Sequence, residues 1–176
     1  MPEIYQPSDD SYFLSEILKS KIKNKSIKCL DMGSGSGIQT QTLIDLGIAP
    51  ENITLEDINP EAVKFLKEKF PQSKIIHSDL FKNIKDKYDW IIFNPPYLPE
   101  DKFDKEKDTT GGKKGSETIN EFLKQAKKHL KKDGKIFLLT SSLTKEIDFL
   151  DYKKKLLGKK KLFFEELKVW ELCLNS

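Results

Sequence analysis

The chain has 176 residues, which we place in one domain over residues 1–176, and its formal net charge is only +3. Apolar residues make up 37% and charged residues 34%, which is typical of a globular protein, and no apolar run approaches the ~20 residues that a membrane span needs. The N-terminus has no signal-peptide pattern, and Cys29 and Cys173 form neither a disulfide framework nor a zinc-site spacing, so we expect a cytoplasmic protein without a bound metal.

Short runs of β type alternate with helical periods along the chain, which predicts an α/β fold with a doubly wound, mostly parallel sheet. A first helix is capped at residues 8–10, and its apolar positions share one face. Seven strands are expected at residues 27–30, 53–55, 75–76, 90–93, 135–140, 161–164 and 167–174, the fifth entered through an Asp133-Gly134 turn. Further helices are expected at residues 39–46, 60–70, 117–130 and 145–157. Because only two residues separate the last two strands, we expect an antiparallel hairpin there.

Residues 98–116 break this alternation, because they are charged and almost without apolar side chains. A long segment without regular structure in a compact domain is usually functional or disordered. Its place directly after Tyr97 favours a lid on the substrate side over plain disorder, with Gly111, Gly112 and Gly115 as hinges.

Three glycines, Gly33, Gly35 and Gly37, follow the first strand, and Asp31 precedes them. Glycine lets the backbone adopt positive φ and approach a ligand, while the start of the next helix offers free N–H groups. The Gly-x-Gly-x-Gly spacing differs from the Gly-x-Gly-x-x-Gly turn that binds a dinucleotide pyrophosphate. Asp31 would repel a pyrophosphate but can accept from a ligand ammonium group, so the turn favours S-adenosylmethionine, which has an ammonium group and no phosphate.

Acidic residues follow the next two strands. An acid about 20 residues after such a glycine turn is placed to accept hydrogen bonds from ribose hydroxyls, and both Glu56 and Asp57 are candidates. We choose Asp57, because it is nearer the carboxyl end of the strand, where ligands bind in open α/β sheets. Asp79, after the third strand, can accept from the adenine amino group, although a helix cap or turn acid is an alternative role.

The tetrad Asn94-Pro95-Pro96-Tyr97 ends the buried fourth strand. An amide or exocyclic nitrogen is a poor nucleophile, because its lone pair is delocalised into the adjoining π system. The Asn94 side-chain oxygen and the Pro95 carbonyl can accept its two hydrogens and aim the lone pair at a methyl-bearing sulfonium. Tyr97 can stack on the planar group. The predicted catalytic residues Asn94, Pro95 and Tyr97 therefore act by positioning, and no general base is required.

Taken in the order in which they occur along the chain, these motifs resemble those of the HemK-like protein glutamine N5-methyltransferases. Members of that family are class I S-adenosylmethionine-dependent enzymes that modify release factors. They read Asp-x-Gly-x-Gly-x-Gly from Asp31, Asp-Ile-Asn-Pro from Asp57, Ser-Asp-Leu-Phe from Ser78 and Asn-Pro-Pro-Tyr from Asn94. Residues 4–12 and 111–117 look like the archaeal and eukaryotic branch of this family, and the resemblance extends over residues 4–142.

The resemblance implies a Rossmann-like fold and a set of cofactor contacts, with Asn94 also holding the substrate. These contacts are Ser11, Asp31, Gly33, Asp57, Asp79, Leu80 and Asn94. It implies that the substrate is the glutamine in the Gly-Gly-Gln loop of a class-1 translation release factor. It also implies a small zinc-binding activator subunit that pairs along the outer strand at residues 75–76.

Two other functions remain open. A DNA adenine or rRNA guanine N-methyltransferase uses the same tetrad, but such enzymes usually need extra surface to grip or flip a base. All 31 basic residues of this chain are lysines, so the arginine fork that reads guanine edges is missing and a nucleic-acid partner is disfavoured. The lysine runs at residues 153–155 and 159–161 are expected to form a solvated face. The other possibility is a non-catalytic S-adenosylmethionine-binding subunit. The intact tetrad speaks against it, because such a subunit does not need those residues.

Overall fold

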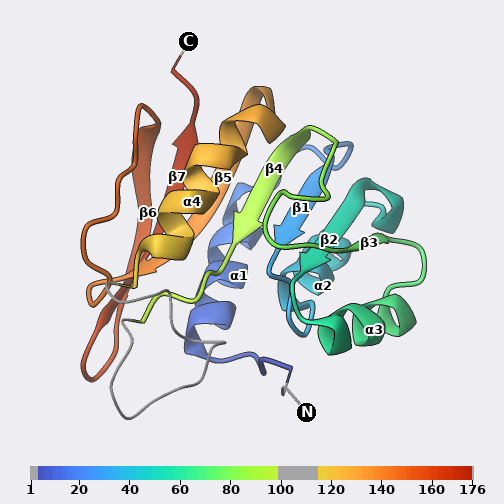
Figure 1. Cartoon of the computed structure of the whole chain (residues 1–176), viewed down its shortest axis with the longest axis horizontal. Helices are drawn as coiled ribbons and strands as arrows, with labels where there is room; N and C mark the ends of the chain where they lie inside the picture. The colour runs from blue at the N-terminus through green and yellow to red at the C-terminus, as the bar shows by residue number, and fades with distance from the viewer. Residues whose placement is uncertain (1–3, 99–114, 176) are drawn as a thin grey trace.

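The computed structural model describes residues 4–98 and 115–175, and these form one seven-stranded sheet with helices on both faces (Figure 1). The helices are α1 Asp9–Lys21, α2 Ile38–Asp45, α3 Pro60–Lys69 and α4 Glu117–Ala126, with short 3₁₀ turns at Pro50–Asn52 and Lys127–His129. The strands are β1 Cys29–Met32, β2 Ile53–Asp57, β3 Lys74–His77, β4 Tyr88–Phe93, β5 Leu130–Ser141, β6 Lys153–Lys161 and β7 Glu166–Cys173. None of the described helices is both long enough and apolar enough to cross a membrane.

The strand order is β3-β2-β1-β4-β5-β7-β6. The first five strands run parallel, whereas β7 pairs antiparallel with both β5 and β6. The predicted doubly wound sheet with a C-terminal antiparallel hairpin is therefore confirmed. The strand order also places residues 75–76 on an edge strand, as expected.

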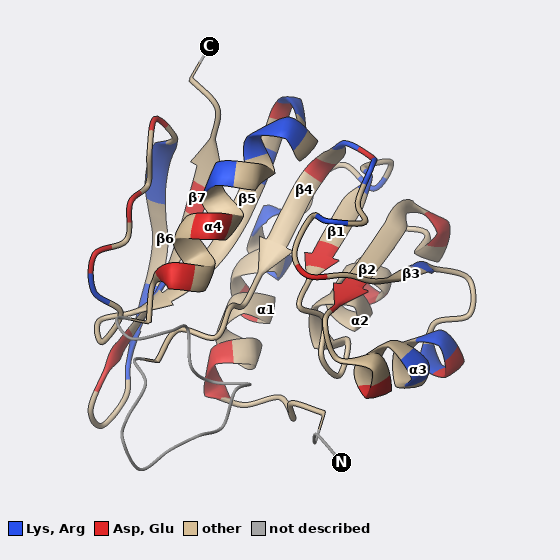
Figure 2. Ribbon diagram, viewed as in Figure 1, with Lys and Arg blue, Asp and Glu red and all other residues tan. Residues whose placement is uncertain are grey.

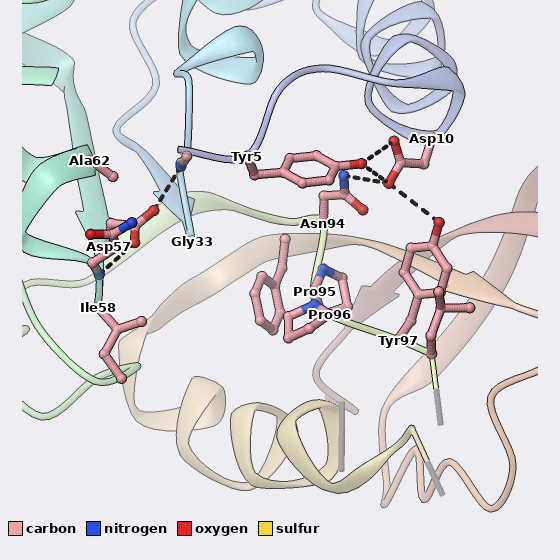
Figure 3. A pocket seen from close by; sticks show the side chains of 14 residues that line it. Tyr5, Asp10, Gly33, Asp57, Ile58, Ala62, Asn94, Pro95, Pro96 and Tyr97 are labelled. Atoms are coloured by element: carbon pink, nitrogen blue, oxygen red, sulfur yellow. Dashed lines mark hydrogen bonds between the residues drawn. The ribbon is translucent and has the colours of Figure 1, made fainter. Parts of the chain in front are cut away.

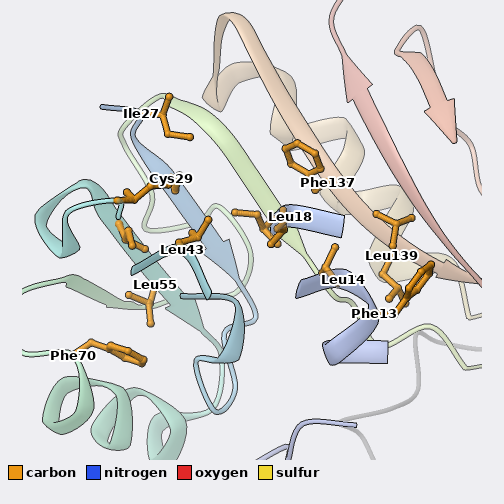
Figure 4. Packing of buried hydrophobic residues seen from close by; sticks show 14 of the residues in the cluster. Phe13, Leu14, Leu18, Ile27, Cys29, Leu43, Leu55, Phe70, Phe137 and Leu139 are labelled. Carbon is orange, nitrogen blue, oxygen red and sulfur yellow. The ribbon is translucent and has the colours of Figure 1, made fainter. Parts of the chain in front are cut away.

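The core has two layers, because successive strand side chains point to opposite faces of the sheet. Ile92 packs on the side of α1, α2 and α3, where Figure 4 shows the cluster around Leu14, Leu18 and Leu43. Its neighbours in β4, Ile91 and Phe93, pack on the opposite side against α4. Because both faces are covered, β1 and β2 are buried along their whole length and β4 is buried at its carboxyl end.

The C-terminal third departs from the sequence-based prediction in two elements. The predicted helix at residues 145–157 is wrong, because residues 142–152 form turns and irregular backbone and β6 begins at Lys153. The predicted strand at residues 161–164 is also wrong, because residues 162–165 form the turn of the hairpin, where the Leu162 N–H donates to the Glu165 carbonyl at 2.8 Å. Antiparallel pairing with β7 along its whole length sets the extent of β6.

The segment that leads into β5 also differs from the sequence-based prediction. The predicted helix at residues 117–130 ends at Ala126, and the 3₁₀ turn at Lys127–His129 leads directly into the strand. Asp133 and Gly134 are part of β5 instead of a turn that precedes it. The register of β5 against β4 shifts between Tyr88 and Trp90 of β4, so the extra residues of β5 are accommodated as a bulge in that strand.

The two edge strands have different chemistry. β6 has the sequence Lys-Lys-Lys-Leu-Leu-Gly-Lys-Lys-Lys and is mostly exposed, and Figure 2 shows the basic residues along it. β3 has only four residues, and its Ile75 and Ile76 are half-buried. Lysines on an edge strand oppose the addition of another chain, whereas apolar side chains on an edge favour it. Only β3 therefore has the character of an edge open to pairing in the described sheet.

The sheet brings residues that are distant in the sequence to one edge. Because β1 lies between β2 and β4, Met32 is in register with both Glu56 and Phe93. The glycine turn after β1, the acids at the end of β2 and Asn94 after β4 therefore meet at the carboxyl ends of the parallel strands. This is where ligands bind in open α/β folds.

Candidate active site

The glycine turn after β1 has left-handed backbone at all three predicted positions. The φ angles of Gly33, Gly35 and Gly37 are 59°, 51° and 75°, which L side chains rarely adopt. Gly33 and Gly35 line a pocket, but Gly37 packs inward: a Cβ atom there would lie 2.3 Å from the Phe70 ring. Gly37 therefore shapes the turn, and its predicted contact with a cofactor stays a prediction.

The pocket beside this turn has a volume of about 170 Å³ and lies between the ends of β1, β2 and β4 (Figure 3). A single water needs only about 10–15 Å³ on the same measure, so the space suits a larger ligand. Its wall includes Asp57 and the entire tetrad that begins at Asn94. A smaller hollow, lined by Ser11 and Asp31, shares Tyr5, Gly33 and Asn94 with the pocket, so the two adjoin.

Two carboxyl groups on the β1–β2 side of the site, Asp31 and Glu56, are buried and therefore hard to ionise. Burial raises the pKa of Asp31 to about 7, although Thr40 opposes the shift by donating to Oδ2 from its hydroxyl at 2.7 Å and its N–H at 3.1 Å. Burial also raises the pKa of Glu56 to about 9, and the nearby acids Asp57 and Asp79 add to the shift. Acids that are desolvated and repel one another are stabilised by a positively charged ligand.

Asp57 and Glu56 occupy different positions, as adjacent strand residues should. Asp57 lines the pocket, where its Oδ2 accepts from the Gly35 N–H at 2.7 Å and its Oδ1 accepts from the Asn59 N–H at 2.8 Å. Glu56 lines neither hollow; its Oε2 accepts from the Gly33 N–H at 3.2 Å. Its Oε1 is buried and has no hydrogen-bond partner among the described residues. Of the two candidates, Asp57 is therefore the one in a position to contact a ligand.

The predicted cofactor contacts Asp79 and Leu80 lie at the same sheet edge but outside the pocket. Asp79 is exposed, Leu80 is half-buried, and neither lines the two hollows. The Ser78 N–H donates to the Asp57 carbonyl at 3.1 Å, which fixes this segment beside the end of β2. Leu80 has a φ of 49°. The roles of Asp79 and Leu80 stay predictions.

The tetrad side of the site holds a buried hydrogen-bond acceptor. The Asn94 Nδ2 donates to Asp10 Oδ2 at 3.1 Å and to Ser11 Oγ at 3.4 Å, while its Oδ1 is buried without a partner among the described residues. Pro95 is buried beside it, and both residues line the pocket. The Tyr97 carbonyl accepts from the Thr144 hydroxyl at 2.9 Å, which anchors the end of the tetrad.

Two residues that line the pocket, Tyr5 and Asp10, were not predicted as site residues from the sequence. The Tyr5 hydroxyl donates to both Asp10 oxygens at 2.9 Å, and the Tyr97 hydroxyl donates to Oδ2 at 3.4 Å. Burial and the Asp10 carboxylate raise the pKa of both phenols, so both stay protonated and can donate. A signal was present for Asp10: it lies three and four residues before Phe13 and Leu14, which places an acid on the buried face of α1.

The site therefore combines two chemical capabilities. Desolvated acids and backbone turns at the ends of β1 and β2 suit a ligand with positive charge and hydroxyl groups. The Asn94 oxygen, which has no partner among residues 4–98 and 115–175, suits a group that brings N–H donors. Pro95, Pro96 and Tyr97 line the pocket beside Asn94 with rigid, largely apolar groups. Within the described residues, no cluster of three or more histidine, cysteine, aspartate or glutamate side chains could hold a metal ion.

A family model, described as the methyltransferase small domain, matches residues 9–162. A Methanocaldococcus jannaschii protein, named as a candidate protein N5-glutamine methyltransferase, is 36% identical over 97% of this chain and 93% of its own length. The ribosomal RNA small subunit methyltransferase C of Haemophilus influenzae is 32% identical over 73% of this chain but only 37% of its own length. The first similarity therefore extends over almost the whole of both proteins, and the second does not.

Among solved structures, a chain of the E. cuniculi Mtq2–Trm112 complex superposes with a TM-score of 0.79. The match covers 99% of this chain and 100% of that chain at 22% identity. That complex is described as responsible for the methylation of the eRF1 translation termination factor. At this identity the likeness is evidence of fold, and it confirms the predicted Rossmann-like methyltransferase architecture.

Proposed function

The chain belongs to the methyltransferase small domain family, within which it is HemK-like, and from this premise we propose that it methylates the side-chain amide nitrogen of a protein glutamine. The observation that carries the proposal is the Asn94 amide. Its Nδ2 is engaged by Asp10, so the buried Oδ1 is left to accept from an incoming N–H group. The similarity over nearly full length to a candidate protein N5-glutamine methyltransferase supports the same chemistry.

S-adenosylmethionine fits the residues on the β1–β2 side. Bound there, it supplies a methyl group activated by a positively charged sulfonium. The raised pKa values of Asp31 and Glu56 mark a site that a cation stabilises, and Asp57 carries carboxylate oxygens at the pocket wall for ribose hydroxyls. We assign the ammonium group to Asp31. The remaining proposed contacts are Ser11, Gly33, Gly35, Gly37, Asp79, Leu80 and Asn94.

The tetrad holds the acceptor nitrogen. A glutamine amide has two hydrogens, which we propose to be accepted by the Asn94 Oδ1 and the Pro95 carbonyl. Gripping both hydrogens favours a pyramidal nitrogen, whose lone pair is then no longer delocalised into the carbonyl. The Tyr97 ring stacks on the amide plane. These residues lower the barrier by orientation and by fixed dipoles rather than by removing a proton.

We propose that the substrate is the glutamine of the Gly-Gly-Gln loop in a class-1 translation release factor, which places the activity in the cytosol. Two glycines before the glutamine leave no side chains to obstruct entry past Pro95, Pro96 and Tyr97, which line the pocket. The structural neighbour is described as acting on eRF1, a termination factor, which supports this substrate class. Residues 99–114 lie outside the described part of the chain, so the predicted lid stays a prediction.

We also propose that a small zinc-binding activator subunit pairs along β3. Ile75 and Ile76 of this edge strand are half-buried, and the nearby Ile58 is 62% exposed. The Ile58 carbonyl lies 2.9 Å from the His77 Nε2, so Ile58 is held beside the end of β3, and it also lines the pocket. A partner bound there would cover apolar surface, so we expect the isolated chain to be poorly soluble or weakly active.

The test is reconstitution. The chain, the activator subunit, the cognate release factor and labelled S-adenosylmethionine are incubated together, and the loop peptide is sequenced by mass spectrometry. Methylation of the Gly-Gly-Gln glutamine, with higher activity when the activator is present, is the expected result. An unmodified glutamine together with label in rRNA or DNA would overturn the protein-substrate proposal in favour of a nucleobase methyltransferase.

A further inference from the structure

The Asp10 carboxylate is a buried acceptor at the centre of the tetrad side of the site. The residue is only 4% exposed, and none of the ion pairs among the described residues includes it. It accepts instead from the Ser11 N–H at 2.6 Å and from the hydroxyls of Tyr5 and Tyr97. A buried charge is tolerated when such charge-assisted hydrogen bonds replace its hydration.

The same carboxylate decides how the Asn94 amide is oriented. An asparagine side chain can rotate by half a turn, which exchanges its oxygen acceptor with its NH₂ donor. An ionised carboxylate can only accept, so a flipped Asn94 would place its oxygen against Asp10 Oδ2, at the position where Nδ2 now lies 3.1 Å away. Two acceptors facing each other in a buried site repel, and the donor would be left pointing into the pocket.

We infer that Asp10 is a positioning residue for methyl transfer, which acts by holding Asn94 with its oxygen toward the acceptor nitrogen. The inference rests on the proposed function, because the orientation matters only if the substrate brings N–H groups to Asn94. Tyr5 and Tyr97 in turn hold the carboxylate, each through its hydroxyl. Figure 3 shows the Asp10 carboxylate joined by dashed lines to the hydroxyls of Tyr5 and Tyr97 and to the Asn94 amide nitrogen.

The adjacent residue, Asp9, is a matched control for charge and helix position. Asp9 and Asp10 both lie in the first turn of α1, where an acid stabilises the helix N-terminus. Asp9 is exposed, however, and its Oδ1 is 2.7 Å from the Lys160 ammonium on β6. A role in helix stability alone would make the two substitutions equivalent, whereas a role through Asn94 belongs to Asp10.

The experiment compares Asp10→Asn and Asp9→Asn in the activator-bound enzyme with the release factor as substrate. Asn has the shape of Asp but offers only one acceptor, so it cannot exclude the flipped amide. We expect Asp10→Asn to lower kcat by about 10²-fold, the scale for losing one preorganised polar contact. The Kd for S-adenosylmethionine and the melting temperature should stay close to the parent values, and Asp9→Asn should leave kcat unchanged.

A double-mutant cycle shows whether Asp10 acts through Asn94. In an Asn94→Ala background no amide remains to be oriented, so Asp10→Asn should cause little further loss of kcat. An undiminished kcat in Asp10→Asn would overturn the inference. If Asp10→Asn lowers kcat by the same factor in the parent and in the Asn94→Ala background, the inference is overturned as well.

A second measurement needs no acceptor substrate, so it separates this inference from the proposed function. In ¹⁵N-edited NMR spectra the Asn94 side-chain amide protons should exchange slowly with water, because the amide is partly buried and its nitrogen donates to Asp10. The slow exchange should persist in Asp9→Asn and disappear in Asp10→Asn. If it persists in both, Asp10 does not hold the amide. If parent enzyme methylates no glutamine yet shows this pattern, the proposed substrate fails and the orienting contact stands.

Discussion

The two sides of the pocket are constructed differently. On the β1–β2 side, carboxylates bind backbone N–H groups of one glycine turn, as in the contact of Asp57 with Gly35 across a sequence separation of 22 residues. On the tetrad side, side chains bind side chains, and Asp10 contacts Asn94 and Tyr97 across separations of 84 and 87 residues. A ligand site made from a turn and its flanking acids is therefore recognisable from local sequence, whereas the orientation of a catalytic group depends on distant packing.

The largest effect is expected at Asn94. The Asn94→Ala variant should lose about 10²–10³-fold in turnover. In the proposed mechanism the Asn94 oxygen accepts from the substrate nitrogen, and this hydrogen bond strengthens as the nitrogen becomes pyramidal. S-adenosylmethionine binding should survive at least in part, since the carboxylates of the β1–β2 side are unaltered. Single-turnover kinetics and calorimetric titration check the two statements separately. Near-normal turnover would break the division of the pocket into a binding side and a catalytic side.

A substitution on the β1–β2 side should have the opposite pattern. Asp57→Ala should weaken S-adenosylmethionine binding by about 1.5–3 kcal/mol, the scale for charge-assisted hydrogen bonds, and leave the domain folded. At saturating cofactor its turnover should approach that of the parent. Titration calorimetry and circular dichroism provide the measurements, with the exposed Asp45→Ala as the control. An unchanged affinity would reject Asp57 as the ribose acceptor and direct attention to Glu56.

The pH dependence of cofactor binding should be next in size. Burial raises the pKa of Asp31 to about 7, and the carboxyl must be ionised to accept from an ammonium group. Below pH 7 binding therefore has to expel a proton, so the affinity should fall by up to about tenfold per pH unit. Above pH 7 it should level off. Titrations between pH 5.5 and pH 8 test this, and Asp31→Asn should bind weakly with a much flatter profile.

The stability of the cofactor-free protein should change with pH in the other direction. The folded state keeps the Asp31 proton up to about pH 7, whereas the ordinary pKa is 3.8, so the folded state binds more protons across that window. The free energy of unfolding should consequently decrease as the pH rises through it. An increase over the same range in denaturant titrations would mean that Asp31 is ionised in the folded protein.

The smallest effect is expected at the Tyr97 hydroxyl. Its contact with Asp10 is long, at 3.4 Å, and Tyr5 already donates to both carboxylate oxygens. Tyr97→Phe keeps the ring that we propose to stack on the acceptor amide, so kcat should fall no more than about threefold. Tyr97→Ala removes the ring and should cost considerably more. Equal losses in the two variants would assign the role of Tyr97 to its hydroxyl and would extend the hydrogen-bonded network at Asp10.

The sequence predicted the mostly parallel sheet with its antiparallel C-terminal pair, and it singled out Gly33, Asp57 and Asn94, which the structure brings to one pocket. These predictions depend on local patterns: buried strands, a glycine turn and acids at strand ends. It did not predict β6, whose six lysines give neither a helical nor an alternating apolar period. It also missed Tyr5 and Asp10. Asp10 resembles an ordinary helix cap until α1 is packed beside β4, and only that contact shows its carboxylate facing Asn94.

The difference between the two edge strands, β3 and β6, also limits how many chains can join through the edges of the sheet. A chain with two receptive edges can add copies indefinitely and form a filament. Here the lysines of β6 repel a further strand on one side, while Ile75 and Ile76 of β3 are open to one on the other. A subunit that adds along β3 should therefore give a closed one-to-one complex, whose mass does not grow with concentration.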